Sequence, residues 1–400
     1  MHDCKGLIQM NFKGLIIGIP KEILKGERRV SATPDTVNKM VSQGAKVLVE
    51  TGAGKDSYFQ DDEYKAVGSE LIDDVEELYS SADIILKVKE PIYSDAKGKH
   101  EVEMMQEGQC IISFLHPAFP GNHQMVRDLA SRRILALTLD GIPRISRAQS
   151  MDALTSMSTI AGYKACLMAA NRLPKFMPMV GTAVGMIKPA VVTVIGTGIA
   201  GLQAVATAKR LGAVVQAVDI RPAANEQAKS LGAKAIELGI PEDLAIAPGG
   251  YAAKLPDKWL EKERGILAPV VADSDIIITA ALIPGKVAPI IITEQMIKQM
   301  KPGSAIVDIA IDQGGNVEIT KPGELIEMYG VSIDGTKNIP GMVPTASTWM
   351  FAKNVYNYLA NLVEDGKINI NLDDEIIAES VVTYNGEIIH AGALEAMNLK

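Results

Sequence analysis

The sequence predicts an α/β protein with two doubly wound parallel-sheet domains, joined by long helices with a cleft between them. Short β-branched runs alternate with helical patterns along almost the whole chain, which is typical of parallel sheets covered by helices on both faces. The length of 400 residues suits two or three domains better than one, and a hydrophobic content of 47% can fill their cores.

The first series of predicted strands lies in the N-terminal part of the chain. Each run is short, apolar and rich in β-branched residues, as in strands that are buried on both faces. These strands are Leu15–Ile19, Lys46–Glu50, Ile84–Val88, Cys110–Leu115 and Ile134–Leu139. Helical spacing in Pro34–Gln43 and Met125–Arg132 predicts helices between them.

A second series begins after Ala190. Its predicted strands are Val191–Ile195, Val214–Val218, Ala235–Leu238, Ile276–Thr279, Ala305–Ile309 and Gly330–Ile333. Between the two series, Ser150–Phe176 has Ala, Met and Leu at helical spacing and is stopped near Pro174, which predicts a long joining helix. The second domain is therefore expected to comprise residues 151–344, including this linker helix.

The end of the chain is predicted to return to the first domain. Asn354–Glu364 has the pattern of a helix, and the tail from Ile368 holds short strands around an Asn385-Gly386 turn. The first domain then comprises residues 1–150 and about 345–400, and the cleft between the domains is the expected ligand site.

Composition excludes several classes of function. The formal charge of −8 is spread along the chain without a basic block, so a nucleic-acid partner is not expected. The three cysteines are far apart and lack metal-ligand spacing, which favours a reduced, intracellular protein without a metal site. Neither a signal peptide nor an uninterrupted apolar run of about 20 residues is found, so direct membrane insertion is not expected.

A glycine motif indicates where a dinucleotide would bind. The strand Val191–Ile195 leads into Gly196-Thr197-Gly198-Ile199-Ala200-Gly201 and then into an Ala-rich helix. In a Rossmann-like domain the first glycine permits the tight turn, the second admits the pyrophosphate and the third lets helix and strand pack closely. The context of strand, turn and helix makes this motif stronger than the glycine pattern alone.

The end of the next strand specifies the dinucleotide. Asp219 ends that strand and is followed by Ile220 and Arg221. A carboxylate at this position accepts hydrogen bonds from ribose hydroxyls and repels a 2′-phosphate, which favours NAD(H) over NADP(H). Arg221 leaves the alternative open, because a nearby arginine can accommodate that phosphate.

One segment points to a family. Residues 143–154, Pro-Arg-Ile-Ser-Arg-Ala-Gln-Ser-Met-Asp-Ala-Leu, closely resemble the Arg-Gln-Asp loop of the proton-translocating nicotinamide nucleotide transhydrogenases. The agreement continues through Ser158–Tyr163. Further matching pieces are Gly18–Glu22, Leu86–Pro91, Thr279–Lys286 and Gly314–Asn316, so the resemblance covers nearly all of the chain after about residue 14.

The resemblance implies a division of labour among subunits. It implies that this chain is the soluble NAD(H)-binding alpha component, and that a partner subunit binds NADP(H). Hydride passes between the two cofactors, and a membrane-spanning subunit couples the transfer to proton translocation. The family's component is a dimer, so a homodimer is expected. The implied location is cytoplasmic, at the inner membrane, through the partner subunits.

The resemblance also implies roles for individual residues. Arg144, Gln149 and Asp152 would act in transfer and hold the nicotinamide end, and Thr155 stands where a serine is more usual. Direct hydride transfer needs no nucleophile, but it needs the rings about 3–3.5 Å apart with water excluded. Without the resemblance, Arg144 and Asp152 could form a surface ion pair, and Ser150 or Asp152 could cap a helix.

Two further positions match the family near the nucleotide. Leu282 follows the strand Ile276–Thr279 and matches a position beside the nicotinamide. Gly250 and Tyr251 lie in Gly249–Ala252, which resembles the family's mobile loop, although an ordinary flexible loop is the alternative.

Alanine dehydrogenases share this superfamily and supply the rival hypothesis. Arg29, Lys87, His116 and Asp312 match residues that this family uses to bind a substrate carboxylate and to move a proton. An NAD-dependent oxidative deaminase is therefore one alternative. A subunit that senses NADH without transferring hydride is another.

Overall fold

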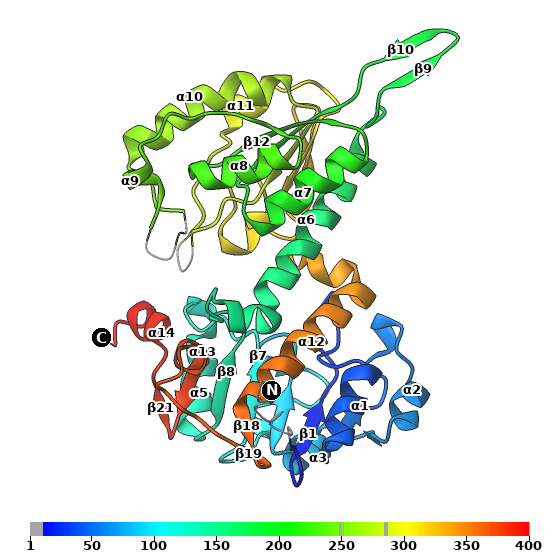
Figure 1. The fold of residues 1–400 in the computed structure, drawn as a ribbon, viewed down its shortest axis with the longest axis vertical. Helices are drawn as coiled ribbons and strands as arrows, with labels where there is room; N and C mark the ends of the chain where they lie inside the picture. Colours follow the sequence, from blue (N-terminus) through cyan, green and yellow to red (C-terminus); the bar gives the residue numbers. More distant parts are fainter. Residues whose placement is uncertain (1–10, 248–249, 251, 284–286, 400) are drawn as a thin grey trace, which may run out of the picture. The chain divides into compact units, whose positions relative to one another are not determined.

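A computed structural model describes residues 11–247, 250, 252–283 and 287–399. It divides into two compact units (Figure 1). The first comprises the described residues up to Met157 together with those from Gly341 onward, and the second comprises Ser158–Pro340. Residues 151–157 and 341–344, which the sequence assigned to the second domain, therefore lie in the first unit.

The first unit is built on an eight-stranded sheet with the order β21-β20-β8-β7-β4-β1-β2-β3. The six strands from β8 to β3 are parallel, and the hairpin β20–β21 adds an antiparallel edge. Their bounds are β1 Ile16–Ile19, β2 Lys46–Glu50, β3 Glu70–Ile72, β4 Ile84–Leu86, β7 Cys110–Ser113, β8 Leu135–Thr138, β20 Val381–Tyr384 and β21 Glu387–Ile388. The hairpin turns at Asn385-Gly386, as predicted.

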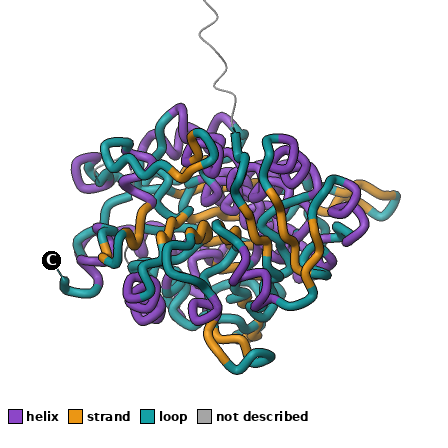
Figure 2. The backbone as a smooth tube through the Cα atoms, turned by 90° about the horizontal axis from the view of Figure 1, so that it is seen from below, coloured by secondary structure: helices purple, strands orange, loops and turns teal. Residues whose placement is uncertain are grey.

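Both faces of this sheet are buried. Ile84, Leu86 and their neighbours contribute to one apolar cluster, whereas Ile85 between them contributes to another. Helices lie on both sides of the central strands (Figure 2). The helices are α1 Pro34–Ser42, α2 Asp61–Ala66, α3 Val75–Ser81, α4 Glu101–Met104, α5 His123–Ser131, α12 Pro344–Leu362, α13 Glu375–Ser380 and α14 Ala391–Ala396.

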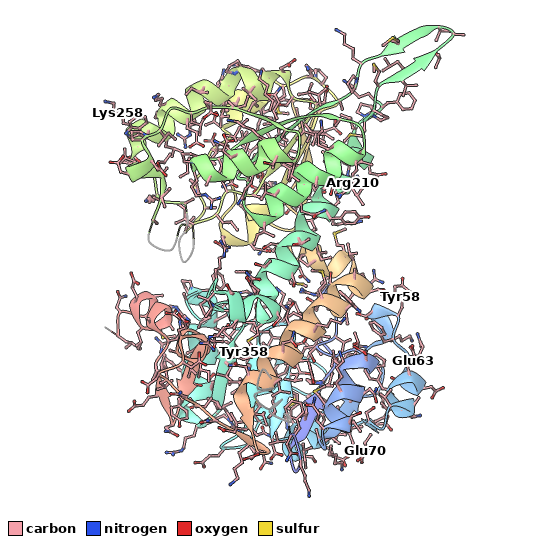
Figure 3. The ribbon with its side chains drawn as sticks, viewed as in Figure 1. Tyr58, Glu63, Glu70, Arg210, Lys258 and Tyr358 are labelled. Atoms are coloured by element: carbon pink, nitrogen blue, oxygen red, sulfur yellow. The ribbon has the colours of Figure 1, made fainter. Side chains whose placement is uncertain are left out.

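Helix α12 begins ten residues before the predicted start, at Pro344 rather than Asn354. Proline suits the first turn of a helix because its missing N–H would have no partner there. Ser347 and Thr348 then face inward, where Thr348 Oγ1 lies 2.7 Å from Ser57 Oγ. Tyr358, labelled in Figure 3, lies on the same helix and is fully buried. Its hydroxyl forms a hydrogen bond with Ser380.

Short elements complete the first unit. The 3₁₀ turns are η1 Lys55–Ser57, η2 Pro120–Asn122 and η3 Ser146–Met151. The small hairpins are β5 Tyr93–Ser94 with β6 Lys99–His100, and β18 Val363–Glu364 with β19 Lys367–Ile368.

The second unit contains a seven-stranded sheet with the order β13-β12-β11-β14-β15-β17-β16. Of these seven strands, β16 alone is antiparallel to its neighbour. The bounds are β11 Val191–Ile195, β12 Val214–Val218, β13 Lys234–Ala235, β14 Ile276–Thr279, β15 Ala305–Asp308, β16 Leu325–Met328 and β17 Val331–Asp334. The strand order reverses between β11 and β14, which is where ligands bind in open α/β sheets. The predicted strand Ala235–Leu238 was wrong in extent, because pairing with β12 ends at Ala235.

Helices connect these strands. They are α7 Ile199–Arg210, α8 Pro222–Ser230, α9 Glu242–Ala245, α10 Asp257–Asp273 and α11 Glu294–Ile297, with the 3₁₀ turn η5 Ile309–Gln313. Helix α6 Ala153–Arg172 begins in the first unit and ends in the second, and the 3₁₀ turn η6 Ile339–Met342 begins in the second unit and ends in the first. The antiparallel hairpin of β9 Val180–Thr182 and β10 Gly185–Ile187 extends away from the rest of this unit (Figure 1). The sequence did not predict it.

Helices α6 and α7 approach each other at Gly162. A Cβ atom on this residue would lie 1.9 Å from the carbonyl oxygen of Ala200. The same side of α6 buries Ala161, Ala165 and Ala169, whose small side chains permit the close approach. Gly162, which belongs to the segment that resembles the transhydrogenases, therefore has a packing role.

Among the described residues, no helix combines the length and the apolar character that crossing a membrane requires.

Replacing Gly162 tests this packing. Gly162→Ala places a methyl group against backbone that cannot move alone, so the free energy of unfolding should fall by about 2 kcal/mol or more. Gly265→Ala is the control, because Gly265 is an exposed helical residue with nothing within 4 Å of an added Cβ. That variant should be stabilised by about 0.5–1 kcal/mol in urea unfolding. Equal effects of both substitutions would contradict the close approach.

Candidate functional site

The turn between β11 and α7 needs glycine at two positions. Gly196 has φ of +86°, and a Cβ on it would lie 2.6 Å from the amide nitrogen of Ala281. A Cβ on Gly201 would lie 1.9 Å from the Gly196 carbonyl oxygen. The turn is therefore packed against both its own helix and the loop that follows β14.

Gly198 is needed for a different reason. Nothing lies within 4 Å of a Cβ built on it, so the backbone borders open space at the start of α7. Gly198 is the N-cap and provides no side-chain hydrogen bond to the first amides of the helix. Free amides at the positive end of a helix attract anions. Together with the adjoining Thr197 and Ile199, this end of α7 fits a pyrophosphate group.

Asp219 lies where β12 ends and is held by the glycine turn. Its Oδ2 accepts a hydrogen bond of 2.8 Å from the amide of Thr197. Its Oδ1 accepts from the amide and the Nε of Arg221, both at 2.9 Å. Asn225 bonds the main chain of Asp219 on both sides. The carboxylate predicted to bind ribose is thus buried and fixed at the carboxyl edge of the sheet.

Glu263 was missed by the sequence analysis. It shares the buried face of α10 with Leu267 and Val271, and α10 leads into β14, so its early turns lie toward the carboxyl edge of the sheet. Burial, together with the negative charge of Asp219, raises the pKa of Glu263 to about 7. A glutamate at a helical position of an apolar face is the signal that would have identified it.

The loop after β14 is organised by a buried asparagine. Asn316 accepts a hydrogen bond from the amide of Ala281 at 3.0 Å and donates to its carbonyl oxygen at 2.9 Å. The buried Asp308 in turn accepts from the Asn316 amide at 2.9 Å. The segment Gly314–Asn316 therefore positions the loop that carries Leu282, whose side chain is partly exposed, and Ala281 of this loop lies against the glycine turn.

The loop predicted to be mobile is described only in part. Tyr251 and Gly249 lie outside the described residues, so their predicted roles receive no structural account. Gly250 has φ of +76°, and its carbonyl oxygen lies 3.5 Å from Nη1 of Arg221.

In the first unit, Asp152 caps helix α6. Its carboxylate accepts 2.8 Å and 2.5 Å hydrogen bonds from the amide and the hydroxyl of Thr155. This is the capping role considered for Asp152 from the sequence, and it is why the helix begins at Ala153 rather than Ser150. Thr155 provides the same hydroxyl donor that a serine would.

The segment before this cap is braced while Gln149 stays exposed. Ala148 is fully buried, and the carbonyl oxygen of Ser150 accepts from Asn354 at 2.9 Å and Asn357 at 3.1 Å, both on α12. The side chains of Arg144 and Gln149 are exposed on either side of this anchor. The structure thus presents a glutamine on a loop of restricted motion.

Two of the residues that the sequence matched to alanine dehydrogenases, Arg29 and Lys87, are already paired with carboxylates. The guanidinium of Arg29 forms 2.7 Å and 2.5 Å bonds with Glu27. The Lys87 Nζ lies 2.7 Å from Glu101 and 3.5 Å from Glu22, and all three side chains are buried. Burial raises the pKa of Glu22 to about 7 despite the nearby lysine. Arg29 and Lys87, the two cations expected to bind a substrate carboxylate, are therefore each already paired with a carboxylate of this chain.

His116 forms a dyad with Asp140, and of these two residues the sequence pointed only to His116. Its Nδ1 lies 2.7 Å from Oδ1 of Asp140, and the His116 amide donates to Oδ2. Burial lowers the pKa of His116, but the Asp140 carboxylate outweighs it and raises the pKa above the usual value. Both residues follow neighbouring parallel strands, β7 and β8, which is the signal that could have found Asp140. Asp312 is exposed in the second unit.

The second unit has the features of a Rossmann-type, dehydrogenase-like α/β protein. These are the strand order of its sheet, the glycine turn after β11 and the acidic residue that follows β12. The chain matches the family models for the N-terminal domain of alanine dehydrogenase/PNT over residues 18–161 and for its C-terminal domain over residues 165–391. The chain belongs to the alanine dehydrogenase/PNT family. The predicted fold class, with two parallel-sheet domains, is confirmed.

The relatives of this chain include both transhydrogenase subunits and alanine dehydrogenases. The chain is 41% identical to a protein of Rhodospirillum rubrum, the first segment of its NAD(P) transhydrogenase subunit alpha, over 94% of this chain and 97% of that protein. It is 33% identical to an alanine dehydrogenase of Staphylococcus saprophyticus, over 96% and 97%. The crystal structure of a transhydrogenase from Sinorhizobium meliloti superimposes with a TM-score of 0.80 at 36% identity, covering 94% of this chain and 99% of that one.

The protonation of Glu263 should appear in the stability of the protein. Its pKa is raised from 4.5 to about 7, so the folded protein keeps a proton that the unfolded chain releases in this range. Stability is therefore lost as pH rises from about 5 to 8, and Glu263→Gln should reduce that loss by about 3 kcal/mol. Denaturant unfolding at each pH measures it.

The exposed Glu261, on the same helix, is the matched control. Glu261→Gln should follow the wild-type pH profile. If Glu263→Gln also follows it, Glu263 is not the buried acid described above.

Proposed function

We propose that this chain is the NAD(H)-binding component of a transhydrogenase. Hydride passes between NAD(H) held here and NADP(H) held by a partner subunit, and a membrane-spanning subunit couples the transfer to proton translocation. The observation that carries the proposal is the braced loop that exposes Gln149, because this loop also carries the resemblance to the transhydrogenases.

The described residues suit the parts of NAD(H). The start of α7 at Gly198 receives the pyrophosphate, and Asp219 receives the adenosine ribose. Gly250 and Leu282 border the nucleotide, and the resemblance alone assigns the same role to Tyr251, which lies outside the described residues. Arg144, Gln149, Asp152 and Thr155 hold the nicotinamide end. When bound, NAD(H) supplies or accepts the hydride.

The protein contributes alignment rather than proton transfer. Hydride exchange between two nicotinamides needs near contact of the rings and exclusion of water. The Gln149 carboxamide can both donate and accept hydrogen bonds, so it can fix the orientation of one cofactor toward the other. Asp152 and Thr155 act as positioning residues, because their mutual hydrogen bonds fix the end of the loop.

The His116–Asp140 dyad favours a second candidate, an alanine dehydrogenase-like deaminase. Against it, Arg29 and Lys87 are neutralised by Glu27, Glu22 and Glu101. A substrate carboxylate would have to break these buried pairs, which costs more than pairing with a free cation. The arrangement therefore supports transhydrogenation over deamination.

A homodimer and a place at the cytoplasmic face of the membrane, through the partner subunits, belong to this proposal. The β9–β10 hairpin supports self-association. It pairs with no strand outside itself among the described residues, and it exposes 98% of Val184 and 73% of Met186. An isolated two-stranded hairpin is marginally stable, so a covering surface would stabilise it.

Sedimentation equilibrium should give a dimer for the wild type and a monomer for the double variant Val184→Asp, Met186→Asp. A wild-type monomer would contradict this aspect of the proposal.

Shortening Gln149 tests the transfer role. Gln149→Asn should lower the turnover of hydride transfer about tenfold or more, with roughly threefold or less change in the NADH dissociation constant, because alignment matters most in the transition state. The assay mixes this chain with a transhydrogenase NADP-binding component and follows transfer to an NADP analogue. Gln299→Asn, an exposed glutamine in the second unit, is the matched control and should leave both quantities unchanged.

The same preparation distinguishes the alternatives. Brisk NADH oxidation with pyruvate and ammonia that is abolished by His116→Ala would favour the deaminase. Normal NADH binding without transfer in the complete mixture would favour an NADH-sensing subunit.

A further inference from the structure

The carboxylate of Asp219 is already saturated with hydrogen bonds from its own chain. Oδ1 accepts from the Arg221 amide and from Arg221 Nε, both at 2.9 Å. Oδ2 accepts from the Thr197 amide and from Arg221 Nη2, both at 2.8 Å, and more weakly from the Thr197 hydroxyl at 3.4 Å. A carboxylate offers about four acceptor positions, so none is left for a ligand.

Two of these donors, the backbone amides of Thr197 and Arg221, cannot leave. The Thr197 amide belongs to the glycine turn, whose backbone is packed against Ala281. The amide of Arg221 belongs to the N-cap residue of α8, whose first turn contains Pro222. Removing either amide would require the turn or the helix start to unfold.

The two short-range donors of the Arg221 guanidinium can leave together. Nε and Nη2 belong to one guanidinium, and the Arg221 side chain is 18% exposed whereas that of Asp219 is 4% exposed. Rotation of this side chain removes one short hydrogen bond from each carboxylate oxygen, and the Thr197 hydroxyl, at 3.4 Å from Oδ2, can turn away without moving the backbone. The adenosine ribose of a dinucleotide carries two adjacent hydroxyl groups, which is the number of donors needed to replace the two short bonds.

We propose that Arg221 is an internal competitor of the ribose, and that the dinucleotide binds Asp219 only by displacing the Arg221 guanidinium. This inference rests on the proposed function, because it takes Asp219 as the ribose-binding residue. It also gives Arg221 a defined role in specificity. Before displacement, the guanidinium competes with the ribose hydroxyls of NAD(H) for Asp219 and so weakens NAD(H) binding. After displacement it lies beside the ribose, where it would pair with the 2′-phosphate of NADP(H).

The test compares two nucleotides that differ only in the ribose. ADP carries both hydroxyls, and 2′,3′-dideoxy-ADP carries neither. Arg221→Met keeps the aliphatic stem and removes the donors. It should lower the dissociation constant of ADP roughly three- to tenfold relative to that of dideoxy-ADP. The ratio cancels the general effect of losing a positive charge near a phosphate. Isothermal titration calorimetry gives all four constants.

Arg210→Met is the control for net charge. Arg210 is exposed at the end of α7 in the same unit (Figure 3). This variant should leave the ratio of the two constants unchanged. Arg221→Lys is the second variant, should the first not fold. A compact ammonium reproduces the guanidinium fork incompletely, so it should give an intermediate ratio. NADPH binding should weaken in Arg221→Met while NADH binding strengthens.

An unchanged or lower preference for ADP in Arg221→Met would overturn the inference. Wild-type binding of both nucleotides is measured first. The experiment can therefore contradict the role of Arg221 without contradicting the proposed function. Wild-type protein that binds ADP but shows no effect of Arg221 retains the proposed function, whereas wild-type protein that binds neither ADP nor NADH loses both.

Discussion

The second unit depends on backbone segments that approach more closely than any Cβ atom allows. Gly162 lets α6 reach α7, Gly201 lets α7 reach the turn at Gly196, and Gly196 lets that turn reach the loop after β14. These contacts fix the start of α7 relative to the loop that carries Leu282, and the hydrogen bond from the Thr197 amide fixes Asp219 beside the same turn. The proposed nucleotide site lies between the carboxyl ends of β11 and β14, where the strand order reverses.

The first unit holds its charges differently. Lys87, Glu22 and Glu101 are buried together, and Arg29 is paired with Glu27. Such buried pairs are costly to break, so they define conformation more than they add stability. The family contains both transhydrogenases and alanine dehydrogenases. Because Arg29 and Lys87 are already paired, they are poorly placed to bind the carboxylate of an amino-acid substrate, which favours transhydrogenation over deamination.

The sequence predicted most features that depend on local pattern. The glycine turn, Asp219, the central strands of both sheets and the β20–β21 turn are readable because period, glycine spacing and turn residues are local signals. The start of α12 at Pro344 was missed because proline, serine and threonine there resemble a loop until the burial of Ser347 is known. Asp140 and Glu263 acquire their roles from tertiary neighbours, His116 and Asp219, that lie far away in sequence. The saturation of Asp219 by Arg221 likewise depends on side-chain geometry that spacing alone does not show.

The most direct test of the account is a crystal structure of the complete chain with NADH. We expect the pyrophosphate at the start of α7, the adenosine ribose on Asp219 and the nicotinamide ring beside Gln149. Nicotinamide density beside His116 with Gln149 left in solvent, or phosphates bound away from Gly198, would contradict it.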